Sequence, residues 1–246
     1  MSLPVHLVPS LDGAAVGSTV TVEGDEAHHA VAVRRLRVGE SVVLTDGLGT
    51  TVVGSVAATG KRLFTVTVAS ASSTSAAEPA FTVVQAIPKG DRGELAVEVL
   101  TEIGVATIVP WAAARCVAVW RGERAAKALA RWRATAREAA KQARRSWLPT
   151  VAAPASTDDV VSLIASADLA VVLHEDASVS LASLPVPASG AVLVVVGPEG
   201  GLTDDEVAAF VDAGAQSVRL GAEVLRTSTA GVAAVAALLA RSGRWA

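Results

Sequence analysis

Short runs in which apolar and polar residues alternate occupy the first part of the chain. They cover Ser18–Val22, Ser41–Thr45, Thr50–Val56 and Leu63–Val68. Alternation with period two is typical of strands that bury one face, and turn pairs such as Asp46-Gly47 separate the runs. We therefore expect a small antiparallel, barrel-like β domain over residues 1–72, with a short helix over Asp25–Arg35 between its strands.

The pattern changes after Ala69–Pro79, a stretch of small and polar residues that is typical of a linker. Longer apolar runs then alternate with amphipathic segments, which favours an α/β domain with a parallel sheet covered on both faces. We assign this domain to residues 73–246. Its expected strands are Phe81–Ile87, Thr107–Pro110, Leu169–Leu173, Val192–Val196 and Ser217–Leu220. Its expected helices are Lys89–Ile103, Glu123–Arg145, Asp204–Ala213 and Thr229–Ala240.

Composition narrows the class of protein. The 246 residues include a single cysteine, Cys116, so no disulfide can form within the chain. The first residues lack the charged and apolar regions of a signal peptide, and the longest apolar run, Ala230–Ala240, is too short to span a bilayer. We expect a cytoplasmic protein in which Cys116 is a small packed hydrophobe.

Charge is unevenly distributed although the net charge is only −3. Between residues 115 and 145 two glutamates face ten basic residues, namely Arg115, Arg121, Arg124, Lys127, Arg131, Arg133, Arg137, Lys141, Arg144 and Arg145. A second basic cluster, HHAVAVRRLR, begins at His28. Such patches are typical of a protein that binds a polyanion, and a solvated helix face is the alternative.

The segment GPEGGLTDDEV follows an apolar strand and carries Gly197, Gly200 and Gly201. Glycines there allow a ligand to approach the main chain closely, and Thr203 and Glu206 have the spacing of a helix capping box. Three acidic residues in the first helical turn would repel a phosphate. A neutral or cationic ligand such as S-adenosylmethionine therefore fits better than a nucleotide, and a tight turn without a ligand is the alternative.

Two more loops follow predicted strands. In LGAEVLRTSTAG, Gly221 follows a strand and Arg226 precedes a helix that Ser228 or Thr229 could cap. A guanidinium beside a ligand loop can hold a phosphate or polarise a carbonyl. Leu173-His174-Glu175 ends a third strand. Because no metal-ligand spacing surrounds His174, we expect no metal site.

GPEGG with a downstream LGAEVLRTSTA resembles the motif pair of the SPOUT methyltransferases. The chain is most similar to the 16S ribosomal RNA uridine N3-methyltransferase family. QAIPKGDRGELAVEVLTEIGV, from Gln85, resembles the strand–KGDR–helix segment of that family, and RWRATAREAAKQARRSWLP, from Arg131, resembles its EAAxQxxRSxxP segment. HHAVAVRRLRVGESVVLTDG resembles its PUA-like RNA-binding domain. The five segments occur in the order of the family.

The resemblance implies a SPOUT-type α/β domain with a C-terminal trefoil knot after a PUA-like β-barrel. It implies methylation of a uridine N3 in 16S rRNA of the small ribosomal subunit, and a homodimer formed through the knotted domain. Arg226 would orient the uracil or stabilise its anion, and Glu199 would accept the proton. The implied S-adenosylmethionine-binding residues are Leu173, His174, Glu175, Gly197, Gly200, Gly201, Leu220, Gly221, Leu225, Thr227 and Thr229. The implied RNA-binding residues are His29, Arg35, Lys89, Arg92, Arg144 and Arg145.

Several positions depart from the family pattern. Arg34 replaces a leucine and Val99 a lysine, Glu223 stands where arginine is usual, and Ser228 where glutamate is usual. Two alternatives stay open: a ribose 2′-O-methyltransferase of the same fold, and a non-catalytic RNA-binding factor in ribosome assembly.

Overall fold

The computed structural model describes residues 3–245, and the chain divides into two compact units. Unit 1 combines Met1–Ala76 with Lys141–Leu148, and unit 2 combines Ala77–Ala140 with Pro149–Ala246. We call residues Lys141–Leu148 the return segment. The sequence did not indicate this return, because contacts between distant segments leave no periodic pattern in either of them.

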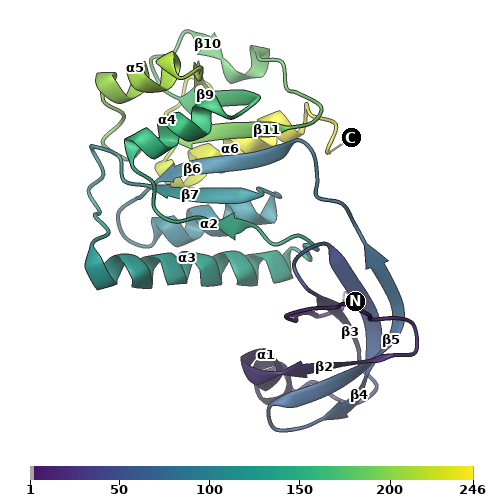
Figure 1. Ribbon diagram of the computed structural model, residues 1–246. Coiled ribbons are helices and arrows are strands. Elements are labelled where there is room, and N and C mark those ends of the chain that lie inside the picture. Colours follow the sequence, from purple (N-terminus) through teal and green to yellow (C-terminus); the bar gives the residue numbers. More distant parts are fainter. Residues whose placement is uncertain (1–2, 246) are drawn as a thin grey trace. The chain divides into compact units, whose positions relative to one another are not determined.

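Unit 1 is built on a five-stranded sheet in the order β1-β3-β4-β5-β2 (Figure 1). Its strands are β1 (Val5–Leu7), β2 (Thr19–Glu23), β3 (Ser41–Thr45), β4 (Thr50–Thr59) and β5 (Leu63–Ser73). The four predicted strands are present, but the sheet is not wholly antiparallel, because β1 pairs with β3 in parallel. With only three residues, β1 is too short to show an alternating pattern.

The expected linker is wrong in its first half, because β5 continues to Ser73. Its small residues pair with β4 across register shifts, Ala71 opposite Val52. A Cβ on Gly54 would lie 2.3 Å from the carbonyl oxygen of Thr67, so the two strands approach closely there. Small polar side chains thus form an exposed strand end whose composition is that of a linker.

The helix expected over Asp25–Arg35 is shorter and irregular. Helix α1 (Gly24–His28) continues into a π-helical turn, η1 (His29–Val33). Ala27 and Ala30 are buried in the core of unit 1. The buried alanines keep one side of this segment packed, while His28, His29 and the arginines that follow are exposed.

Hydrogen bonds and an ion pair attach the return segment to the rest of unit 1. Lys141 Nζ lies 2.9 Å and 3.0 Å from the two carboxylate oxygens of Glu26. His6 Nδ1 donates to the same carboxylate at 3.1 Å. Trp147 Nε1 donates to the carbonyl oxygen of Thr74 at 2.8 Å. The return segment is therefore a structural part of unit 1.

Gly49→Ala should destabilise unit 1. Gly49 has φ +101, and an added Cβ would lie 2.6 Å from the carbonyl oxygen of Thr74 and 2.7 Å from the Trp147 ring. We expect a loss of about 3 kcal/mol or more, from backbone strain plus overpacking. Urea unfolding measures it. Gly13→Ala is the matched control, because Gly13 has φ +74 in open space and should lose only the strain part, about 1 kcal/mol.

Glu26 makes unit 1 sensitive to acid. Burial by itself would raise the pKa of Glu26, but hydrogen bonds from His6 and Lys141 and the charge of Lys141 outweigh it and lower the pKa from 4.5 to about 2. A lowered folded-state pKa stabilises the fold above the unfolded value, and this stability disappears as the pH falls towards 2. Glu26→Gln should cost about 2 kcal/mol at pH 7 after allowance for solvent screening.

Unfolding at several pH values tests this expectation. The difference between wild type and Glu26→Gln should shrink steadily below pH 5 and vanish near pH 2. A difference that does not depend on pH would show that the charge of Glu26 has no part in it.

Unit 2 is a seven-stranded, wholly parallel sheet in the order β10-β12-β9-β11-β6-β7-β8. Its strands are β6 (Ala80–Ala86), β7 (Thr107–Trp111), β8 (Thr150–Val151), β9 (Leu169–Leu173), β10 (Val179–Ser180), β11 (Ala191–Val196) and β12 (Gln216–Arg219). Its helices are α2 (Arg92–Glu102), α3 (Gly122–Gln142), α4 (Thr157–Ala165), η2 (Leu181–Ser183, a 3₁₀ turn), α5 (Asp204–Asp212) and α6 (Thr227–Leu239). The last two residues of α3 belong to unit 1.

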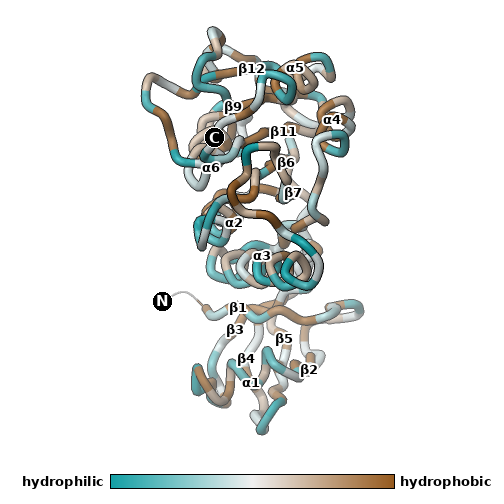
Figure 2. The backbone as a smooth tube through the Cα atoms, turned by 90° about the vertical axis from the view of Figure 1, so that its left-hand side faces the viewer, coloured by the Kyte–Doolittle hydropathy of each residue, from teal (hydrophilic) through white to brown (hydrophobic). Residues whose placement is uncertain are grey.

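Helices cover both faces of this sheet (Figure 1). On β11, Val192, Val194 and Val196 pack with α2, α3 and α6, while Leu193 and Val195 pack with α4 and α5. The tube in Figure 2 is hydrophobic along these strands and mixed along α3. The expected α/β class is confirmed, because only a doubly covered sheet buries such continuous apolar runs.

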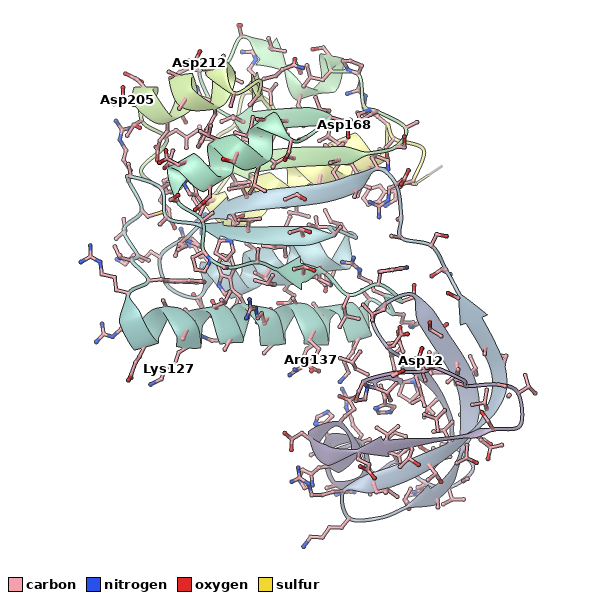
Figure 3. All side chains as sticks on the ribbon, viewed as in Figure 1. Asp12, Lys127, Arg137, Asp168, Asp205 and Asp212 are labelled. Carbon is pink, nitrogen blue, oxygen red and sulfur yellow. The ribbon has the colours of Figure 1, made fainter. Side chains whose placement is uncertain are left out.

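Several helix ends differ from expectation. Lys89-Gly90-Asp91 forms a turn, so α2 begins at Arg92, and α3 ends at Gln142 rather than Arg145. Helix α4, which the sequence pattern did not predict, begins with a capping box between Ser156 and Asp159. Lys127 and Arg137 of α3 point away from the sheet (Figure 3). Within residues 3–245, no helix combines the length and apolar character needed to cross a membrane.

Candidate functional site

A cavity of about 600 Å³ lies at the carboxyl ends of β9, β11 and β12 in unit 2. Parallel strands place their carboxyl ends at one edge of the sheet, so the loops that follow them meet there. Three loops line the cavity, over residues 173–176, 197–202 and 220–227. This size is within the range of small-molecule sites.

Most of the predicted cofactor residues line this cavity. Those that do are Leu173, His174, Glu175, Gly197, Gly200, Gly201, Leu220, Gly221, Leu225 and Thr227. Thr229 does not, because its hydroxyl turns back to donate to the carbonyl oxygen of Arg226 at 3.2 Å. Both predicted catalytic residues, Glu199 and Arg226, are also at the cavity.

The glycine loop after β11 is held by its own helix. Thr203 and Glu206 form the predicted capping box at the start of α5. The buried Glu206 carboxylate also accepts a hydrogen bond from Ala114 N at 2.8 Å. Gly201 has φ +71, a conformation that favours glycine. The loop therefore has a defined shape before any ligand binds.

Arg115 is a cavity residue that the sequence analysis missed. Its guanidinium donates to the carbonyl oxygen of Leu202 at 3.0 Å. A Cβ on Gly200 would lie 3.0 Å from both Cβ and the carbonyl oxygen of Arg115. Gly200 thus lets the chain around Arg115 pack against the glycine loop. Arg115 belongs to the basic stretch of the sequence, but no local pattern connects it with residues 85 positions later.

Gln85, at the end of β6, is a second missed residue. Gln85 is fully buried, and its Nε2 donates to Thr227 Oγ1 at 3.1 Å, while Thr227 Oγ1 donates to the carbonyl oxygen of Gly197 at 2.7 Å. Within the described residues, no group hydrogen-bonds to Gln85 Oε1. These bonds hold the start of α6 against the ends of β6 and β11.

The start of α6 also corrects an expectation. Neither Ser228 nor Thr229 caps the helix, because its N-cap residue is Arg226, which makes no side-chain cap. Ser228 is buried instead. After β12 the chain crosses back, so that α6 packs on α2, β6 and β11. This crossing back is what the SPOUT resemblance implies for a knotted C-terminal segment.

Glu199 joins two loops at the cavity. Its Oε1 accepts a hydrogen bond from Lys89 N at 3.2 Å and lies 3.9 Å from an Arg92 guanidinium nitrogen. The turn before α2 therefore touches the glycine loop, and Arg92 lines the cavity. Arg226 is exposed at the same cavity.

The charges around the cavity are mixed. The arginines Arg92, Arg115, Arg219 and Arg226 line it together with the carboxylates Glu175, Asp176, Glu199, Asp204 and Glu223. Such a lining suits a ligand that carries charges of both signs, as S-adenosylmethionine does with its sulfonium, ammonium and carboxylate groups.

The described residues give little support to metal-dependent chemistry or to a reactive thiol. Over residues 3–245, no group of three or more potential ligands could hold a metal ion. Burial raises the pKa of the Cys116 thiol, which keeps the thiol protonated and unreactive at neutral pH. Cys116 is half-buried rather than fully packed, and its thiol lies 3.8 Å from the carbonyl oxygen of Trp111.

The predicted RNA-binding residues fall into two groups. His29, Arg35, Arg144 and Arg145 lie in unit 1, and Lys89 and Arg92 lie in unit 2 beside the cavity. Arg144 and Arg145 lie in the return segment, not in the helix that the sequence predicted for them.

Comparison with known proteins identifies both parts of the chain. Residues 76–239 match the model of the RNA methyltransferase domain, and residues 22–69 match that of the RNA methyltransferase PUA domain. The chain is 44% identical to ribosomal RNA small subunit methyltransferase E of Mycobacterium bovis, over 93% of this chain and 89% of that protein. It is 30% identical to the Bacillus subtilis enzyme of the same name, over 89% of each.

Solved structures agree with the sequence comparison. A ribosomal RNA small subunit methyltransferase E from Neisseria gonorrhoeae, bound to S-adenosylmethionine, superposes with a TM-score of 0.88 at 30% identity, over 97% of this chain and 98% of that one. A Legionella pneumophila methyltransferase in complex with the same cofactor gives a TM-score of 0.87 at 27% identity, over 98% of each chain. The chain belongs to the RNA methyltransferase family, as one of its small-subunit ribosomal RNA methyltransferases with an N-terminal PUA domain.

Proposed function

We propose that this protein methylates N3 of a uridine in 16S rRNA within the small ribosomal subunit, with S-adenosylmethionine as the methyl donor. The observation that carries the proposal is the cavity, where three loops after parallel strands meet with Arg226 and Glu199 at the same site. Relatives that are named for small-subunit rRNA methylation support the substrate class.

The ten predicted cofactor residues at the cavity would hold S-adenosylmethionine, which when bound supplies an electrophilic methyl group on sulfur. The protein's part is to orient the uracil so that N3 lies in line with that methyl group. Loss of the N3 proton leaves negative charge on the uracil oxygens, and a fixed cation lowers the cost of that charge. We assign this role to Arg226.

Glu199 is the proposed proton acceptor, and its second carboxylate oxygen is available because Lys89 N binds only the first. A competing role is to hold the turn that carries Arg92. Glu199→Gln separates the two roles, because an amide oxygen keeps the bond from Lys89 but cannot accept a proton. If Glu199 accepts the proton, Glu199→Gln should lower turnover about 10²-fold or more, as much as Glu199→Ala does. Turnover near wild type in Gln with loss in Ala would establish the positioning role.

RNA binding is assigned to His29, Arg35, Arg144 and Arg145 in unit 1 and to Lys89 and Arg92 in unit 2. Contacts of this kind with phosphates predict binding that weakens steeply with salt. We also propose a cytoplasmic homodimer. On α6, Ala237 is exposed and would be available to a partner, whereas Ala234 is buried within the chain. Exposed Val224 and Leu225 offer further apolar surface.

Labelling of small ribosomal subunits tests the reaction. Subunits from cells that lack this protein are incubated with it and isotope-labelled S-adenosylmethionine, and the RNA nucleosides are separated. We expect label in 3-methyluridine. Label in a 2′-O-methylated nucleoside would identify a ribose methyltransferase instead. No label, with no cofactor binding by calorimetry, would leave a non-catalytic assembly factor.

A further inference from the structure

Gln85 is a fully buried polar residue on a strand whose other buried positions are apolar. Those apolar positions of β6 are Phe81, Val83, Val84 and Ala86. Gln85 and Val83 point to the same face of the sheet, because alternate residues of a strand share a face, and α6 packs on that face. Burying an amide is costly unless hydrogen bonds satisfy it, so glutamine at this position needs a reason.

The surroundings of Gln85 determine which way its amide group points. Nε2 lies 3.1 Å from the carbonyl oxygen of Ala86, 3.3 Å from that of Thr227 and 3.1 Å from Thr227 Oγ1. Carbonyl oxygens can only accept, and Thr227 Oγ1 donates its own proton to the carbonyl oxygen of Gly197 at 2.7 Å. All three neighbours of Nε2 are therefore acceptors, and a reversed amide would place its oxygen among them.

The other half of the amide is unsatisfied. Oε1 of Gln85 is buried, and no donor among residues 3–245 hydrogen-bonds to it. An unpaired buried acceptor destabilises a fold, whereas an apolar side chain of the same shape can be neutral or stabilising. The stability of the fold therefore does not account for glutamine at this position, but the bonds from its Nε2 to Thr227 do.

Packing holds α6 against the sheet without help from these bonds. Gly231 lies one helical turn after Thr227, and a Cβ added to Gly231 would lie 3.2 Å from a methyl carbon of Val196 and 3.6 Å from one of Val83. Val235, one turn further along, is fully buried in the same core cluster. The contact of the helix with β6 and β11 is thus secured by apolar packing, and the bonds of Gln85 act on the first residue of the helix.

That first residue connects two loops of the cavity. Thr227 lines the cavity and directly follows Arg226, the residue proposed to stabilise the uracil anion. Its hydroxyl also binds Gly197, the first residue of the glycine loop after β11. Gln85 itself lies in the core, where it holds the one hydroxyl that links the helix start to the glycine loop.

We propose that Gln85 is a positioning residue for the methyl transfer. Through Thr227 it sets where the helix start that carries Arg226 lies relative to the glycine loop. This inference rests on the proposed function, in which Arg226 acts on the uracil, and adds the core residue that sets the position of Arg226. A misplacement of about 1 Å can lower a rate about 10²-fold, so these bonds matter more to turnover than to folding.

Gln85→Met tests the inference, because methionine has nearly the shape of glutamine but cannot donate to Thr227. We expect a thermal midpoint within about 4 °C of wild type, since the lost bonds are offset by removal of the unpaired Oε1. The single-turnover rate at saturating S-adenosylmethionine and small ribosomal subunits should fall about 10- to 100-fold. The affinity for subunits should stay within about 2-fold of wild type.

A double-mutant cycle shows whether Gln85 acts through Thr227. Thr227→Val removes the hydroxyl that links Gln85 to Gly197, and it should lower the single-turnover rate at least as much as Gln85→Met does. Adding Gln85→Met to Thr227→Val should then lower the rate by less than about 2-fold further, because the two side chains act as one unit. Losses that multiply would overturn the inference, since Gln85 would then act independently of Thr227.

Thr101→Val is the matched control, because Thr101 is also polar and fully buried in unit 2 but lies on α2. It should leave the single-turnover rate within about 2-fold of wild type. The inference is overturned if Thr101→Val slows the reaction as much as Gln85→Met does, or if Gln85→Met reacts as fast as wild type. It is also overturned if Gln85→Met lowers the thermal midpoint by more than about 4 °C, because Gln85 would then serve the fold.

The same experiment separates this inference from the proposed function. Production of 3-methyluridine by wild-type protein reports the function alone. Wild-type production of 3-methyluridine, together with an unchanged rate in Gln85→Met, would reject the positioning role and keep the function. A different methylated nucleoside would reject the proposed function, while a rate of its formation that falls in Gln85→Met would keep the positioning role. No methylation by wild type would reject both.

Discussion

Arg226→Ala is expected to lower turnover by about 10²- to 10³-fold while cofactor affinity stays within a few-fold of wild type. The guanidinium is exposed at the cavity. Alanine removes the guanidinium but keeps the contacts of this residue with α6, because those contacts are made by its backbone. The carbonyl oxygen of Arg226 accepts hydrogen bonds from Thr229 N at 2.8 Å and Ala230 N at 2.9 Å. Alanine keeps both.

Single-turnover methylation of small subunits and calorimetry with S-adenosylmethionine measure the two effects separately. Arg226→Lys is the matched variant, because it keeps the charge and loses the planar fork, so its turnover should fall between wild type and alanine. Loss of cofactor affinity in proportion to turnover would show that Arg226 shapes the loop rather than acts on the uracil.

Glu206→Ala is expected to lower the free energy of unfolding by about 2–4 kcal/mol. The buried carboxylate accepts hydrogen bonds from Thr203 N at 2.9 Å, Thr203 Oγ1 at 3.1 Å and Ala114 N at 2.8 Å. Alanine removes every acceptor and leaves the two backbone donors without partners. Because both segments border the cavity, cofactor affinity should also fall.

Asp205→Ala is the control for Glu206, since Asp205 lies in the same first turn of α5 but is exposed (Figure 3). It should change the free energy of unfolding by less than about 0.5 kcal/mol. Equal losses in the two variants would mean that the helix dipole, and not the hydrogen bonds of Glu206, accounts for the effect.

Local patterns predicted most of the regular structure. The alternation in β3 and β4 reports directly which face of each strand is buried, because side chains along a strand point to opposite faces with period two. The continuous apolar run of β11 indicates burial on both faces. The capping box of Thr203 and Glu206 was also predictable from the sequence, because its two members lie within one helical turn. Glycines in GPEGG and LGAEV located two of the three loops at the cavity.

Failures occurred where composition and contacts disagree. The small polar end of β5 has the composition of a linker, yet pairing with β4 makes it a strand. Ser228 and Thr229 have the residue types of helix caps, but Ser228 is buried and Thr229 bonds back to Arg226. In each case a tertiary or backbone contact overrides a preference worth about 1 kcal/mol.

The sequence by itself determined the α/β class, the loops that carry the chemistry and the family, because these depend on residues close together in the chain. Only the tertiary structure decided that Arg115 lines the cavity, that Gln85 holds Thr227 at the start of α6, and that the return segment belongs to unit 1. Those placements depend on hydrogen bonds between residues about 70 to 140 positions apart. Such bonds need complementary partners in space but no repeated spacing along the chain, so no local pattern records them.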